Sequence, residues 1–103
     1  MRLPKTVHIC GKKVSIIANK EHDGGSFDID TYTIEIGTSD TAEIAENILH
    51  EIGEAIMVMR DFRFAAEKEE LENSDYRFIL NHADWQLFAK DLSIALRGVK
   101  FDK

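Results

Sequence analysis

The sequence contains few of the residues that cross-link or interrupt a small fold. Cys10 is the only cysteine and Pro4 the only proline among 103 residues. A single cysteine excludes an intrachain disulfide and a zinc cage built from cysteines, and it favours a reducing compartment. The apolar runs are only a few residues long, too short for a membrane span or a signal peptide. We therefore expect a soluble, cytoplasmic protein.

Basic residues are absent from one long part of the chain. Residues 21–59 contain ten Asp and Glu and no Lys or Arg, whereas the rest contains nine acids and thirteen bases. The formal net charge is -6. Because a phosphate backbone requires a basic surface, this composition argues against nucleic acid and anionic membranes as partners. The local surplus of acids suits a divalent cation instead.

The length and the hydrophobic pattern predict one α+β domain over residues 1–103. A chain of this size buries about two thirds of the surface that its unfolded form exposes. Alternation and turn residues predict strands at 6–10, 12–18, 26–28 and 31–36, which we expect to form a small antiparallel sheet. A short strand is expected at 76–80, and the charged segment 65–75 is either a solvated helical turn or a loop.

Two helices complete the predicted fold. The first begins at the N-cap residues 38–40 and runs to about Arg60, with apolar residues at three- and four-residue spacing. The second begins after Asn81 and ends at Arg97, before Gly98. Its expected buried residues are Trp85, Phe88, Leu92 and Ala95.

A candidate metal site lies within the first predicted helix, in the sequence His50-Glu51-Ile52-Gly53-Glu54. Positions four apart lie one turn above each other, so His50 and Glu54 can bind one ion while Glu51 lies beside it. A hydrolytic zinc site needs three protein ligands, a water and a carboxylate that takes the water's proton. His50 and Glu54 are therefore candidate ligands, and Glu51 is the candidate general base.

The third ligand must come from elsewhere, and His82 is the first choice. It lies in the first turn of the second helix, which could pack over His50. Asp84 is the alternative, either as an oxygen ligand or as a residue that orients a ligating imidazole. His8 and His22 are weaker candidates.

The same residues also fit a solvated helix face without metal. Glu46, His50 and Glu54 form a row at four-residue spacing, so a protonated His50 would relieve the repulsion between the carboxylates. A base folded over from Arg60, Arg63 or Arg77 would do the same.

Two other ligand patterns are weaker. Residues 23–30 are acidic like a calcium loop, but this loop would place Asp28 where glycine is needed and Ile34 where the bidentate glutamate belongs. Cys10 near His8 suggests a thiol catalyst, yet a single cysteine in a strand is commonly a small buried apolar residue.

Residues 25–56 resemble the core of the zincin-like metallopeptidases, particularly their small phage- and prophage-associated members. The similar parts are Gly25-Ser26-Phe27-Asp28, Tyr32-Thr33-Ile34-Glu35-Ile36 and the segment around His50-Glu51. The resemblance implies a zinc ligand at His50, a general base at Glu51 and an extended peptide substrate along residues 32–36. Glu54 departs from the family pattern, which has a second histidine at that position. A phage origin would place the protein in the cytoplasm of the host cell.

Three hypotheses about function follow. The first is a zinc-dependent peptidase or related hydrolase with His50, Glu54 and His82 as ligands and Glu51 as base. The second is a catalytically inactive phage or prophage accessory protein that binds another protein. The third is a structural acidic domain, with a homodimer as one form of it.

Overall fold

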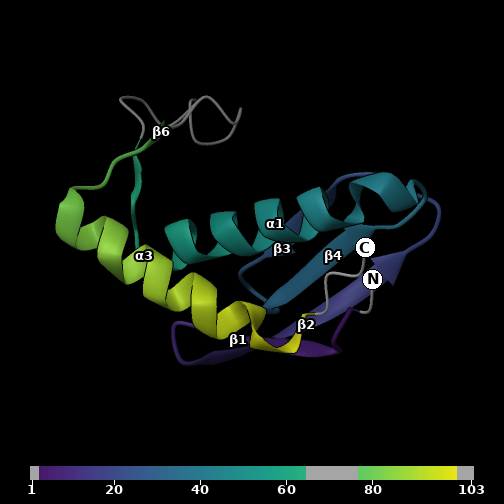
Figure 1. The fold of residues 1–103 in the computed structure, drawn as a ribbon, viewed down its shortest axis with the longest axis horizontal. Helices are drawn as coiled ribbons and strands as arrows, with labels where there is room; N and C mark the ends of the chain where they lie inside the picture. The colour runs from purple at the N-terminus through teal and green to yellow at the C-terminus, as the bar shows by residue number, and fades with distance from the viewer. Residues whose placement is uncertain (1–2, 65–76, 100–103) are drawn as a thin grey trace.

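The computed structural model describes residues 3–64 and 77–99 and shows the expected α+β fold, with one layer of helices on a mixed sheet (Figure 1). The sheet contains β1 (Thr6–Ile9), β2 (Lys12–Asn19), β3 (Gly25–Asp28) and β4 (Thr33–Gly37). The helices are α1 (Ile44–Met59) and α3 (His82–Ala95). The segment 65–75, for which two conformations were considered, lies outside the described residues.

The first two strands form the predicted hairpin. Ile9 pairs with Lys12, so only Cys10 and Gly11 form the turn. Both turn residues have positive φ, 51° at Cys10 and 78° at Gly11. This is the geometry of a two-residue turn whose twist matches that of the strands, and glycine adopts it without steric cost.

The sheet is mixed and not wholly antiparallel as predicted. Its order is β1-β2-β4-β3, and β2 and β4 are parallel, with Ile16 opposite Ile34. The antiparallel hairpin of β3 and β4 therefore adds to β2 through its second strand. The physical reason is burial, because Ile34 and Ile36 are 0% exposed and fill the centre of the sheet. Alternation identifies the strands but does not determine which neighbour each strand takes.

Helix α1 begins and ends where the sequence predicts. The Asp40 carboxylate accepts a hydrogen bond from the Ala42 N–H at 3.0 Å, and a 3-10 turn over Thr41–Glu43 leads into the helix. Its buried side chains face the sheet together with the inward positions of β1, β2 and β4. The buried apolar core consists of Val7, Ile9, Val14, Ile16, Ile34, Ile36, Ile48, Ile52, Ala55, Ile56, Ala95 and Val99.

Helix α3 also starts at its predicted cap. Asn81 accepts from the Asp84 N–H and Asp84 accepts from the Asn81 N–H, which is a complete capping box. A 3-10 turn, Leu96–Gly98, ends the helix. One expected core residue is wrong, because Trp85 is 52% exposed and stacks on Phe88 with the ring centroids 5.5 Å apart.

A second, two-stranded sheet joins the ends of the two helices. β5 (Arg63–Phe64) pairs antiparallel with β6 (Arg77–Phe78), which confirms a short strand within the region predicted at 76–80. None of the helices in the described part of the chain is both long and apolar enough to cross a membrane.

Candidate metal centre

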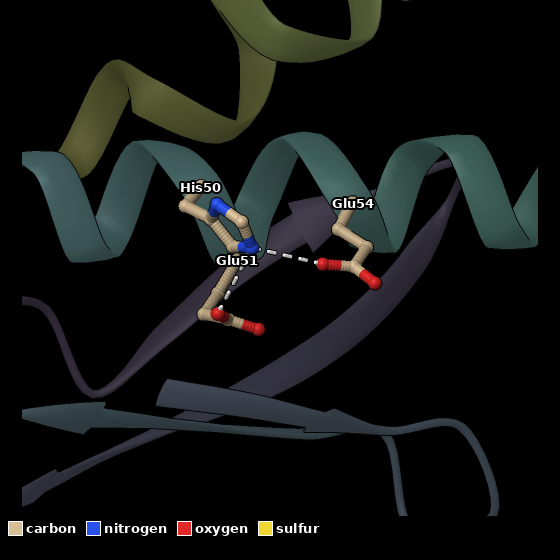
Figure 2. A group of neighbouring side chains, drawn as sticks. All are labelled: His50, Glu51 and Glu54. Atoms are coloured by element: carbon tan, nitrogen blue, oxygen red, sulfur yellow. Dashed lines mark ion pairs between the residues drawn. The ribbon is translucent and has the colours of Figure 1, made fainter. Parts of the chain in front are cut away.

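Three acidic and imidazole side chains meet on one face of α1. His50, Glu51 and Glu54 each offer a donor atom, and these atoms all lie within 4.8 Å of one another. Figure 2 shows His50 and Glu54 reaching toward each other along the helix while Glu51 extends toward the strands. Within residues 3–64 and 77–99, this is the cluster whose donor atoms could hold an ion. The four-residue spacing thus produces the proximity that it predicts.

The distances between the donor atoms are close to those between two ligand atoms that bind one cation. His50 Nε2 lies 3.0 Å from Glu54 Oε2 and 3.7 Å from Glu51 Oε2. Two ligands about 2.0 to 2.1 Å from a tetrahedral zinc ion would be about 3.3 Å apart. Small changes of side-chain torsion angles would therefore place His50 and Glu54 around one ion.

The three side chains differ strongly in exposure. His50 is 65% exposed, Glu54 27% and Glu51 only 7%. Glu51 occupies the inner side of the cluster, and an added Cβ at Gly25 of β3 would lie 2.8 Å from Glu51 Cγ. The cluster is thus open to solvent at His50 and closed by the sheet beneath Glu51.

Burial changes the acidity of Glu51. Desolvation raises the pKa of its carboxyl group, His50 lowers it, and the nearby Glu54 raises it. A carboxyl group whose pKa is raised in this way binds a proton more readily than a solvated one. This property suits a general base next to a metal-bound water, provided that the ion is present.

The structure does not bring the proposed third ligand, His82, into this cluster. The ring of Phe88 lies 3.7 Å from an added Cβ at Gly53, so α3 packs against α1 at Phe88, near the site. His82 precedes Phe88 by six residues, or about 9 Å along a helix. The alternative, Asp84, accepts the hydrogen bond of the capping box.

The remaining candidates also lie elsewhere. His8 is in β1 and His22 is in the loop before β3. Residues 25–28 of the suspected calcium loop form a strand, and Asp28 accepts the N–H of Asp30.

The metal-free interpretation of the row formed by Glu46, His50 and Glu54 is supported for one pair of its residues, His50 and Glu54. His50 and Glu54 form the four-residue contact, with His50 Nε2 3.0 Å from Glu54 Oε2. Arg60 does not act as a neutralising base here, because its Nε donates to Asp91 Oδ2 at 2.8 Å.

Sequence reasoning missed a buried carboxylate at the contact between the helices. Asp91 is 6% exposed and accepts two hydrogen bonds from Arg60, at 2.8 and 3.1 Å. Cys10 donates to the same carboxylate at 3.6 Å. The arrangement joins α1, α3 and the first hairpin, so its role is structural. The sequence does contain a signal for this buried carboxylate, because the acid Asp91 stands next to Leu92 on the apolar side of the second helix.

No protein-family model, curated protein or solved structure matches this chain.

Proposed function

We propose that this chain is a zincin-like zinc-binding protein with His50 and Glu54 as ligands. The single observation that supports the proposal is the cluster itself, with donors from one helix face within 4.8 Å of one another. Imidazole and carboxylate are a common ligand pair for zinc. Water completes the coordination on the exposed side of His50, where solvent has access.

We further propose that Glu51 is the general base of a peptide or amide hydrolase. A zinc ion supplies a water of lowered pKa and polarises the carbonyl group. Glu51 lies on the inner side of the cluster, 3.7 Å from His50 Nε2, within reach of a water held at the site. The raised pKa of its carboxyl group favours proton uptake.

The strand available to an extended substrate is β3 and not residues 32–36. β4 lies between β2 and β3 in the sheet, so both of its edges are already paired. β3 is an outer strand, and its Gly25 is next to Glu51. A peptide added to the outer edge of β3 would run past the site.

The second candidate function is a binding protein that retains the fold without catalysis. The observation that favours it is the position of His82 outside the cluster, which leaves fewer ligands than a hydrolytic zinc site ordinarily has. An accessory protein of this kind would act through contacts with another protein.

Zinc binding distinguishes the metal proposal from a solvated helix face. We expect one zinc ion per chain by titration calorimetry, a Kd raised at least tenfold by His50→Ala or Glu54→Gln, and no change in His82→Ala. His82 is exposed at the start of α3. His82→Ala also removes one imidazole group and is therefore the matched control for His50→Ala. Equal zinc affinity in His50→Ala and the wild type would refute the site.

Catalysis needs a separate measurement. We expect Glu51→Gln to retain zinc while losing cleavage of a mixed peptide library, read by mass spectrometry. Zinc binding without cleavage in the wild type would favour the binding protein. Cleavage that survives Glu51→Gln would remove Glu51 as the base.

A further inference from the structure

The outer edge of β1 carries backbone groups that β2 does not use. β1 is at the end of the sheet, opposite to β3. The Ile16 N–H donates to the Lys5 carbonyl, and the alternation of an antiparallel pair then directs the hydrogen bonds of Val7 and Ile9 toward β2. The N–H and C=O groups of Thr6 and His8 consequently point away from β2, toward an edge with which no other described strand pairs.

A pocket lies beside this edge. It has a volume of about 230 Å³ and is lined by Thr6, Val7 and His8 of β1 and by Ile94, Ala95 and Arg97 at the end of α3. Figure 1 shows the end of α3, in yellow, next to β1. The pocket thus combines open strand hydrogen-bonding groups with an apolar wall.

Among the described residues, the pocket lining contains one cation, Arg97, and no Asp or Glu. Residues 1–20 contain five Lys and Arg and no Asp or Glu. Lys13 lies directly across from His8 in the hairpin, and both side chains are exposed. Asp91, the acid of α3 that lies closest in sequence to Arg97, is paired with Arg60. Among the described residues, no ion pair involves Arg97 or Lys13.

We propose that the β1 edge binds an extended acidic peptide segment from another protein. Its backbone pairs with the N–H and C=O groups of Thr6 and His8, and successive side chains alternate between two sides. Small apolar side chains enter the pocket against Val7 and Ala95. Carboxylate side chains face the opposite side, where Lys13 is exposed beside His8.

Charge also distinguishes this partner from a second copy. Two-fold pairing of β1 with β1 would bring the same basic residues of both copies together, because an isologous contact repeats one surface. Like charges placed opposite each other destabilise a pair of strands. The acidic peptide has the complementary charge.

The proposal is tested with a dye-labelled, terminally blocked peptide of alternating valine and glutamate, in the presence of a chelator so that the metal site plays no part. We expect binding by fluorescence anisotropy that weakens with salt, and none with the alternating valine and lysine peptide. A version N-methylated at alternate residues should bind at least tenfold more weakly, because it lacks the donors that the edge needs.

Two variants locate the site. Lys13→Glu should raise the Kd of the acidic peptide at least tenfold, whereas Lys20→Glu, the same charge change at an exposed position just past the other end of β2, should change it less than threefold. His8→Pro removes an outward N–H that β2 does not use and should weaken binding equally.

Three outcomes would overturn the proposal. They are equal binding of the acidic and basic peptides, equal binding of the N-methylated peptide, or equal effects of Lys13→Glu and Lys20→Glu. A dimer in sedimentation analysis that His8→Pro dissociates would identify a second copy as the occupant instead.

Discussion

Glu51 depends on the absence of a side chain at Gly25. A Cβ at Gly25 would lie 2.6 Å from the Glu35 carbonyl oxygen and 2.8 Å from Glu51 Cγ, both closer than atoms can pack. Glycine at this position therefore allows β3 to approach α1 and lets the carboxylate lie against the strand. The closed side of the proposed metal centre is built from this contact.

We expect Gly25→Ala to destabilise the fold by about 1 to 3 kcal/mol, the usual cost of overpacking, and to displace Glu51. Urea unfolding measures the first effect, and the loss of peptide cleavage, which depends on Glu51, measures the second. Ser26→Ala, at the next and exposed position of the same strand, serves as the control. Unchanged stability and unchanged cleavage in Gly25→Ala would contradict the close approach.

The acidity of Cys10 is a second property set at single residues. Burial raises the pKa of its thiol, and the Asp91 carboxylate raises it further, while Arg60 lowers it. The folded chain therefore keeps the thiol protonated to a higher pH than the unfolded chain does. This shift opposes the role of a thiol nucleophile at neutral pH.

We expect the pH profile of iodoacetamide alkylation of Cys10 to have a higher midpoint in the folded protein than in urea. The midpoint is the readout, since restricted access of the reagent to the thiol lowers the rate without moving the midpoint. A folded-state midpoint at or below that of the unfolded chain would show that the thiolate is stabilised.

The candidate site shows which of its residues can be predicted from residue spacing alone. His50, Glu51 and Glu54 are brought together by one helix, whose geometry follows from the chain itself. His82 belongs to another helix, and its position depends on how α3 packs against α1. The contact of Phe88 with Gly53 and the pairing of Arg60 with Asp91 decide that packing, and neither can be read from spacing.

At the scale of elements, the helix boundaries were the most predictable features because they depend on local hydrogen bonds. Asn81 caps α3, and Asp40 caps the 3-10 turn that leads into α1, as their side chains predict. Burial along α3 was less predictable. Its first half extends beyond the core, which leaves Trp85 and Leu87 exposed. The apolar pattern, in contrast, predicts burial for Trp85.

We expect Asn81→Ala to lower the free energy of unfolding by about 1 kcal/mol, because the Asp84 N–H loses its acceptor. Chemical denaturation measures the loss. His82→Ala, an exposed change at the adjacent position, should have an effect below about 0.5 kcal/mol. Similar effects of the two changes would show that the cap adds nothing.

At the scale of the whole molecule, stability is concentrated at the centre of the sheet. Ile34 is 0% exposed and pairs on both sides, with Ile16 of β2 and Phe27 of β3. A domain of this size has a free energy of unfolding of about 5 to 15 kcal/mol. A single cavity at Ile34 can therefore remove a large part of the free energy of unfolding.

We expect Ile34→Ala to remove about 2 to 5 kcal/mol, since it deletes buried methyl groups and leaves a cavity. Ile17→Ala removes the same atoms from a side chain of the same sheet that is 50% exposed, and its effect should be much smaller. Urea midpoints at constant slope give the comparison. Equal losses would place Ile34 outside the core.

The parallel pairing of β2 with β4 has a consequence for how the molecule assembles. β1 with β2 and β3 with β4 are each joined by short connections, whereas partners along the parallel pair are 18 residues apart, as Ser15 and Thr33 are. Closing a longer loop costs more conformational entropy and takes more time than forming a local hairpin. We therefore expect the two hairpins to form first and their docking along β2 and β4, with α1 closing over them, to set the refolding rate. Substitutions at Ile16 or Ile34 are accordingly expected to slow refolding, whereas substitutions in the β1–β2 turn mainly change a step that is already fast.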